Sequence, residues 1–279
     1  MTENTSLLIL AGGSSSRMKR SLESVKLSED TKNIALKVHK SLIPLGKTEK
    51  PLLYYLLKNA KAAGYQKIYL ITSPENEAFH DFIDSNVSEY LPLNFVLQYL
   101  PEGRKKPLGT ADALAQAMAQ YPELKSNSFT ICNGDNLYSV KALSLLRENR
   151  EAPHALISYS RSGLQFPDQR ISKFAVMAID KENYLENIIE KPEPQVLEKY
   201  RDVYGEIRVS MNVFSFDGAS IDQYIRDCPI HPLRQEKELP EAVRNFVKDH
   251  PKQFITIPVS EHLPDLTAAD DIEDFAKLQ

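Results

Sequence analysis

The chain has 279 residues, 42% of them hydrophobic and 26% charged, which is the composition of a folded globular protein rather than a disordered or fibrous one. Its formal net charge is -4, so no overall basic charge attracts nucleic acid or an anionic membrane. The two cysteines, Cys132 and Cys228, lie far apart and form no CxxC-type motif, which argues against a cysteine metal cluster or a disulfide framework. No apolar run approaches the roughly 18 residues of a membrane-spanning helix. We expect a cytoplasmic protein that binds neither nucleic acid nor membrane.

Alternation of strand-like and helix-like segments predicts the fold class. Helical spacing occurs at residues 51–63 and 111–120, with Thr110 as the expected N-cap of the second, and returns at residues 239–247 and 268–278. Strand followed by helix, repeated, predicts right-handed βαβ units and a mostly parallel α/β sheet. Runs rich in β-branched and aromatic residues predict the strands, at residues 7–10, 67–72, 95–98, 129–133, 155–159, 174–179, 211–216 and 254–257.

Two stretches depart from this alternation. Strands follow one another with little helix between them at residues 155–216, which indicates an added antiparallel or mixed β-layer. The polar stretch at residues 19–40 carries charges of both signs, and it is interpreted as a long loop. Such a loop is either solvated and flexible or a lid over a substrate.

A loop rich in glycine and serine follows the first predicted strand, with the sequence Leu10-Ala11-Gly12-Gly13-Ser14-Ser15-Ser16-Arg17-Met18. Glycine and serine let backbone N–H groups approach a polyanion closely, and Arg17 can add bidentate contacts to a phosphate. The loop contains neither the GxxxxGK[ST] nor the GxGxxG pattern. Alone, it is typical either of a phosphate-binding turn or of a strand-to-helix turn with no ligand.

Further polar residues follow later predicted strands. Gln98 ends one strand. Gly109 precedes the predicted helix and lets the backbone approach a planar base closely, and the start of this helix offers free N–H groups. Asp135 follows the buried strand at residues 129–133, at the carboxyl end where ligands bind in open α/β sheets. Carboxylate oxygens suit Mg²⁺, which needs only one or two acids when phosphate and water complete its coordination.

In this order, the segments resemble the signature of the sugar-phosphate nucleotidyltransferases, the family that makes nucleotide sugars and related compounds. The resemblance runs from Leu10 to Asp271 and includes a Lys-x-Leu-x-Pro element beginning at Lys40. It implies a doubly wound, mostly parallel, Rossmann-like α/β sheet with an added mixed β-layer for the acceptor. It also implies one domain over residues 1–279, in which residues 1–150 bind the nucleotide and residues 151–279 bind the acceptor.

The resemblance assigns roles to individual residues. Arg17 would hold the β,γ-phosphates, Lys40 would neutralise charge on the triphosphate or the acceptor phosphate, and Asp135 would bind Mg²⁺; these are the predicted catalytic residues. A second Mg²⁺ ligand is expected at Asp265, and the alternative for this segment is that Thr267 caps the last helix. The predicted nucleotide-binding residues are Leu10, Ala11, Gly12, Gly13, Ser14, Ser15, Ser16, Gln98, Gly109 and Thr110. The predicted acceptor-binding residues are Glu190, Lys191 and Asn212.

The predicted reaction couples a nucleoside triphosphate to a phosphorylated acceptor, with release of pyrophosphate. A sugar 1-phosphate is the default acceptor, phosphocholine or another alcohol phosphate is the alternative, and a pyrimidine is the preferred base. A catalytically silent module that binds nucleotide or nucleotide sugar is a second hypothesis. A glycosyltransferase of the related fold is disfavoured because the chain offers Gly134-Asp135-Asn136 in place of a DxD metal motif. Assembly into a homo-oligomer is left open.

Overall fold

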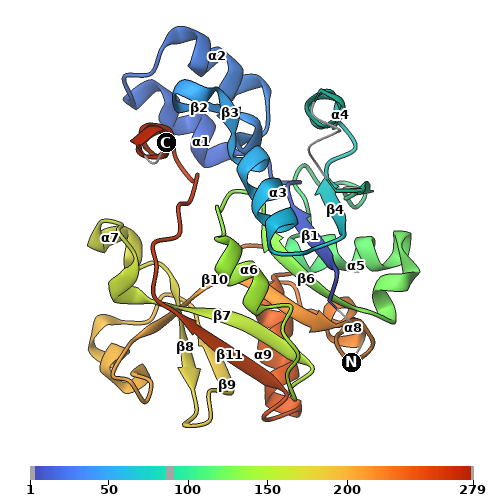
Figure 1. Cartoon of the computed structure of the whole chain (residues 1–279), viewed down its shortest axis with the longest axis vertical. Helices are drawn as coiled ribbons and strands as arrows, with labels where there is room; N and C mark the ends of the chain where they lie inside the picture. The colour runs from blue at the N-terminus through green and yellow to red at the C-terminus, as the bar shows by residue number, and fades with distance from the viewer. Residues whose placement is uncertain (1–3, 86–90, 278–279) are drawn as a thin grey trace.

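A mixed β-sheet, which has nine strands in the part of the chain that the structure describes, forms the centre of the protein and is flanked by helices (Figure 1). The computed structural model describes residues 4–85 and 91–277. The strands follow one another in the order β11-β7-β10-β6-β1-β4-β5, and β8 and β9 extend the sheet from β10. A separate ribbon pairs β2 (Pro44–Leu45) with β3 (Lys50–Pro51). The strands of the large sheet are β1 (Ser6–Leu10), β4 (Lys67–Thr72), β5 (Leu93–Leu97), β6 (Ser128–Asn133), β7 (His154–Ser160), β8 (Ala175–Ile179), β9 (Leu185–Ile189), β10 (Arg208–Asp217) and β11 (Phe254–Val259).

The sheet is parallel around β1. This strand pairs in parallel with β4 on one side and β6 on the other, and β5 continues the parallel arrangement beyond β4. Because side chains alternate along a strand, Leu7 and Ile9 pack in one core cluster with α3 (Leu52–Ala62), whereas Leu8 packs in another with α5 (Thr110–Gln120). The predicted Rossmann-like α/β fold is confirmed, and the carboxyl ends of β1 and β6 meet at one edge.

Antiparallel strands enter the sheet in the second half of the chain. β10 runs antiparallel to β6, β7 and β8, and β8 pairs in the same sense with β9. The predicted mixed layer is therefore present. β9 was not predicted, since its buried residues Leu185 and Ile188 are separated by two exposed ones, and a register shift in the β8–β9 pair breaks the period-two pattern.

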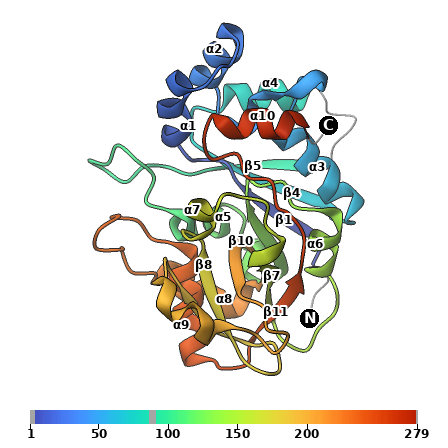
Figure 2. The same cartoon turned by 90° about the vertical axis from the view of Figure 1, so that its left-hand side faces the viewer.

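The long loop predicted at residues 19–40 is wrong, because most of this stretch is helical. α1 (Ser16–Ser21), a 3₁₀ turn, α2 (Glu29–Lys37) and a second 3₁₀ turn at Lys40–Leu42 occupy it. The sequence carried a signal for a helix at the start of α2. There Ser28 accepts a hydrogen bond from the N–H of Thr31, and two acids occupy the first turn. Figure 2 shows α1 and α2 at the same end of the molecule as α10 (Asp270–Lys277).

The remaining helices complete the layers around the sheet. In the second half of the chain, α9 lies close to the helix predicted at residues 239–247. No described helix is both long and apolar enough to span a bilayer. These remaining helices are α4 (Glu77–Asp84), α6 (Val140–Leu145), α7 (Asp168–Ile171), α8 (Gly218–Arg226) and α9 (Leu239–Asp249).

Candidate active site

An open cleft of about 500 Å³ lies at the carboxyl ends of β1 and β6. Leu10 and Asn133, the last residues of these strands, line it, together with Arg17, Lys40 and Asp135. Of the predicted nucleotide-binding residues only Ala11, which is buried beneath the loop, is missing from its wall. The structure thus brings the predicted nucleotide and catalytic residues to one place.

The glycine-serine loop forms one wall of the cleft and leaves its backbone available. Among the described residues, none accepts a hydrogen bond from the N–H of Gly12, Gly13 or Ser14. Ser15 adopts a left-handed conformation with φ of 53°, and its hydroxyl accepts a hydrogen bond of 3.1 Å from the backbone N–H of Lys40. The loop therefore offers donors to an anion, while the Ser15 side chain fixes the segment that carries the lysine.

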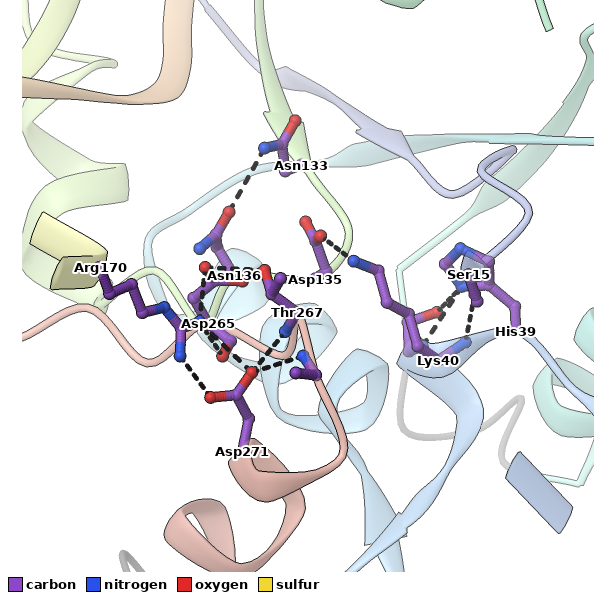
Figure 3. Close-up of polar contacts among 12 residues, drawn as sticks. Ser15, His39, Lys40, Asn133, Asp135, Asn136, Arg170, Asp265, Thr267 and Asp271 are labelled. Atoms are coloured by element: carbon purple, nitrogen blue, oxygen red, sulfur yellow. Dashed lines mark hydrogen bonds and ion pairs between the residues drawn. The ribbon is translucent and has the colours of Figure 1, made fainter. Parts of the chain in front are cut away.

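Lys40 and Asp135, which both line the cleft, form an ion pair (Figure 3). Asp135 follows β6 through Gly134, where a Cβ atom would lie 2.8 Å from the carbonyl oxygen of Leu10, so only glycine fits this turn. Arg17, on α1, is exposed and has no ion-pair partner among the described residues. The two predicted phosphate-binding cations thus differ: one is held by a carboxylate and the other faces solvent.

Asp265 lies next to this pair but is buried and does not line the cleft. Its carboxylate accepts hydrogen bonds from Arg170, at 2.8 Å, and from the hydroxyl of Thr267 (Figure 3). Asp271 also pairs with Arg170, and it accepts the N–H groups of Thr267 and Ala268 at 2.7 Å each. The predicted helix cap at Thr267 is therefore wrong, because Asp271 satisfies these N–H groups and the Thr267 hydroxyl serves Asp265.

The two predicted metal ligands are close enough to interact. Asn136 and Asp265 form a β-bridge, and the N–H of Leu266 donates to the carbonyl oxygen of Asp135 at 2.8 Å. Burial raises the pKa of Asp265, and the negative charge of Asp135 raises it further. Three carboxylates, on Asp135, Asp265 and Asp271, face two cations, so the group carries one net negative charge.

Gln98 and Gly109 both line the cleft and contact each other. Only 4% of the surface of Gln98 is exposed, and its amide nitrogen donates a hydrogen bond to the carbonyl oxygen of Gly109 at 3.0 Å. Gly109 has φ of 116°, and a Cβ atom there would lie 2.3 Å from the carbonyl oxygen of Lys237. Gly109 is therefore required for contact with the segment before α9, besides any role in approaching a base.

The prediction that Thr110 is the N-cap of α5 is wrong. α5 begins at Thr110, the capping position is Gly109, and no side chain caps it. The hydroxyl of Thr110 instead accepts the N–H of Leu239, the first residue of α9, at 2.9 Å. The N–H of Ala111 donates to the carbonyl oxygen of Lys237, so this N–H group is not free for a base as expected.

The predicted acceptor residues do not line the cleft. Glu190 lies 3.8 Å from Arg234, which also pairs with Glu238 on the cleft wall at 2.8 Å. Lys191 is exposed, and Asn212, with φ of 53°, lies where the register of β10 against β7 shifts. Glu190 is thus connected to the cleft through Arg234, and Asn212 is connected to it through Tyr138 and Asn136, which accepts a hydrogen bond from Asn133 on the cleft wall.

Several residues of the cleft were not predicted from the sequence. His39 precedes Lys40, and its Nδ1 accepts the N–H of Ser41 at 3.2 Å, while burial and the charge of Lys40 lower its pKa to about 4. The position of His39 directly before the lysine motif could have indicated that it lies in the cleft. No sequence motif marks Glu236 and Glu238, which lie just before α9. The unpredicted lining residues include Arg20, His39, Lys106, Glu236 and Glu238.

Comparison with known proteins identifies similar chains. The profile of the nucleotidyl transferase family matches residues 6–258. Glucose-1-phosphate adenylyltransferase 2 of Vibrio cholerae serotype O1 is 24% identical over 253 residues, which is 88% of this chain and 55% of that protein. The corresponding enzyme of Nitrosomonas europaea is 26% identical over 256 residues, 89% of this chain and 53% of that protein. The chain spans about half the length of these curated relatives.

Solved structures share the fold along nearly the whole chain. A putative glucose-1-phosphate thymidylyltransferase from Bacillus anthracis has a TM-score of 0.70 at 20% identity, covering 98% of this chain and 94% of that one. UDP-glucose pyrophosphorylase complexed with UDP-glucose has a TM-score of 0.70 at 15% identity, covering 99% and 98% of the two chains.

Proposed function

The chain belongs to the nucleotidyl transferase family, and we propose that it couples a nucleoside triphosphate to a sugar 1-phosphate, giving a nucleotide sugar and pyrophosphate. The observation that carries the proposal is the convergence of the glycine-serine loop, Arg17, Lys40 and Asp135 on one cleft. A sugar 1-phosphate is supported as the acceptor because glucose 1-phosphate appears in the names of the similar proteins.

The first step is binding of the triphosphate. The free N–H groups of Gly12, Gly13 and Ser14 suit phosphate oxygens, and Arg17 adds a cation that no described residue neutralises. Lys40 stabilises the charge that accumulates on the phosphate oxygens when the α-phosphorus is attacked. Ser15 preorganises this lysine by holding its backbone N–H.

The residues beside Lys40 fit a magnesium ion. Asp135 and Asp265 would supply hard oxygen ligands, and the net negative charge of their group favours a cation. No cluster of three or more His, Cys, Asp or Glu side chains among the described residues could hold a metal. Mg²⁺ binds through one or two carboxylates when phosphate and water complete its coordination, so Asp135 and Asp265 would suffice. A bound Mg²⁺ would neutralise phosphate charge; Arg170 and Thr267 hold Asp265 in place for it.

The acceptor phosphate supplies the nucleophile. Its oxygen is already ionised near neutral pH, so no residue needs to act as a general base. A bond forms between this oxygen and the α-phosphorus, the bond from the α-phosphorus to the bridging oxygen breaks, and pyrophosphate leaves with that oxygen. The protein contributes positioning and charge stabilisation.

The proposal is tested by pyrophosphate release from pairs of nucleoside triphosphate and phosphorylated acceptor. Glucose 1-phosphate, other sugar 1-phosphates and phosphocholine are each combined with ATP, GTP, CTP, UTP and dTTP. We expect turnover with a sugar 1-phosphate, dependence on Mg²⁺, and loss of turnover in Asp135→Asn. Turnover with phosphocholine alone would place the acceptor outside the sugars.

Controls separate a catalytic loss from a folding loss. Asp135→Asn must retain the circular dichroism and melting temperature of the native chain, and Lys47→Met replaces an exposed lysine outside the cleft. Binding of Mn²⁺ measured by electron paramagnetic resonance reports the metal site without turnover. Nucleotide binding with no pyrophosphate release from any pair would refute the enzyme and support a binding module.

A further inference from the structure

His39 precedes the 3₁₀ turn that carries Lys40, and one nitrogen of its ring caps this turn (Figure 3). Nδ1 of His39 accepts a hydrogen bond from the backbone N–H of Ser41 at 3.2 Å, and the hydroxyl oxygen of Ser41 lies 2.8 Å from the same atom. The ring also packs against Phe79 of α4, with 5.6 Å between the ring centroids. Contacts with two different elements therefore fix the orientation of the imidazole.

The cap decides which nitrogen of the His39 ring carries the proton. A backbone N–H can only donate, so Nδ1 must offer its lone pair to Ser41, and the buried hydroxyl of Ser41 can donate to the same lone pair. Burial, and after it the charge of Lys40, lower the pKa of His39 to about 4, so the ring is neutral at neutral pH. A neutral imidazole holds one proton, and this proton is therefore on Nε2.

The N–H at Nε2 of His39 is free and accessible. No described residue bonds to Nε2, and this atom is not one of the buried polar atoms without a partner, so it is open to solvent. His39 lines the cleft, as does Ser15, whose hydroxyl holds the backbone N–H of Lys40. The ring thus offers one neutral donor to the cleft that also receives the free N–H groups of the glycine-serine loop.

We propose that His39 binds the pyrophosphate portion of the nucleoside triphosphate by donating its Nε2–H to a phosphate oxygen. This rests on the proposed function, which places the triphosphate against the glycine-serine loop. Lys40 is already paired with Asp135, whereas the imidazole N–H is uncommitted. A phosphate oxygen is a strong acceptor for such a donor, because hydrogen bonds to charged groups are about twice as strong as those between neutral groups. A neutral donor also adds no repulsion to the neighbouring ammonium group of Lys40.

NMR of the imidazole nitrogens reads the position of the proton directly. Long-range proton–nitrogen spectra are recorded for the native chain and for His39→Gln, and the ring signals missing from the variant are those of His39. We expect a neutral ring with its proton on Nε2, and a shift of the Nε2 signal during titration with inorganic pyrophosphate in the presence of Mg²⁺. A proton on Nδ1 in the free or the bound protein, or an Nε2 signal that does not move while pyrophosphate binds, would overturn the proposal.

Two variants separate the cap from the donor. The side-chain oxygen of asparagine takes the place of Nδ1, and asparagine is a favoured cap, so His39→Asn keeps the turn and removes the donor at Nε2. We expect this variant to bind pyrophosphate about tenfold more weakly, and to raise KM for the triphosphate with little change in kcat, because the donor contacts the phosphate before and during the reaction. The longer amide of His39→Gln brings a nitrogen near the position of Nε2, so binding should be retained although the cap is weakened.

The opposite pattern would show that His39 has a structural role alone. Retained binding of pyrophosphate in His39→Asn, together with loss of binding in His39→Gln, would therefore overturn the proposal. His80→Asn is the matched control, because His80 is an exposed histidine on α4 that contacts the ring of Phe95 outside the cleft. An equal loss of binding in this control would also overturn it.

The outcomes distinguish this proposal from the proposed function. A shifted Nε2 signal and weaker binding in His39→Asn, without turnover of any substrate pair, would refute the proposed function and leave His39 as a phosphate-binding residue. Turnover with an unchanged KM in His39→Asn would refute the role of His39 alone. Failure of the native chain to bind pyrophosphate would overturn the role of His39 whether or not turnover is found.

Discussion

Replacing Arg170 by methionine tests how the acidic group beside the cleft is held. The side chains of Arg170, Asp265 and Asp271 are 23%, 10% and 8% exposed, so the guanidinium balances two carboxylates that are largely removed from water. Removing one partner of a buried ion pair costs about 3–5 kcal/mol, because the remaining charge is left uncompensated. Asp271 keeps its two backbone N–H donors, whereas the hydroxyl of Thr267 is the one donor that Asp265 keeps among the described residues. We therefore expect a loss of about 3 kcal/mol, mainly at Asp265.

Urea unfolding followed by circular dichroism, in the presence of EDTA, measures this loss. The double variant Arg170→Met with Asp265→Asn should recover part of the stability, because the uncompensated charge is removed with little change in shape. Arg226→Met is the matched control, since Arg226 pairs with Asp222 on α8 and its side chain is 50% exposed. That variant should lose at most about 0.5 kcal/mol. A loss below about 1 kcal/mol in Arg170→Met, or none recovered by Asp265→Asn, would refute the reasoning.

Three further predictions concern the cleft and the core. Gly109→Ala should destabilise the protein by about 2–4 kcal/mol and weaken nucleotide binding, because its Cβ would lie 2.3 Å from the carbonyl oxygen of Lys237. Gly103→Ala is the control: nothing lies within 4 Å of its Cβ, so thermal unfolding should show only the smaller destabilisation caused by its positive φ. Lys40→Met should lower kcat about 10²–10³-fold in protein that circular dichroism shows to be folded, and an unchanged kcat would show that this lysine takes no part in the reaction. Burial lowers the pKa of His154 to about 3, against 6.5 when unfolded, so stability is lost as the pH falls below 6.5, by up to about 1.4 kcal/mol per pH unit. His154→Gln should remove that slope from denaturation curves recorded between pH 4 and 7, and an unchanged slope would show that His154 is not its source.

The parallel half of the sheet and the cleft loops were predictable because their determinants are local. β4 was predicted with its observed bounds, since a continuous apolar run is what a strand covered on both faces requires. The glycine-serine loop and Asp135 come shortly after two such strands, β1 and β6, in the sequence. Each of these signals lies within a few residues of the feature it predicts.

The features that were missed depend on contacts between distant segments. Thr110 fits the ordinary helix-capping pattern in the sequence, yet its hydroxyl accepts a hydrogen bond from Leu239 of α9, which lies 129 residues away along the chain. Arg170 has no motif of its own, and its importance appears only where α7 meets the segment before α10. The acceptor residues remain predictions, because the described cleft contains none of them.

The position of β10 in the sheet has a consequence for how the chain must be made. β10 lies between β6 and β7 and pairs with both, so residues 208–217 complete the sheet on which the first half depends. A growing chain that ends near residue 150 presents β6 as an open edge, and open edges invite pairing with other chains. Pairing across so long a separation is also slow, because loop closure precedes the contacts that reward it. The sheet can therefore be completed only after residues 208–217 have been made, and cutting the chain near residue 150 should give an aggregating fragment rather than a separate nucleotide-binding unit.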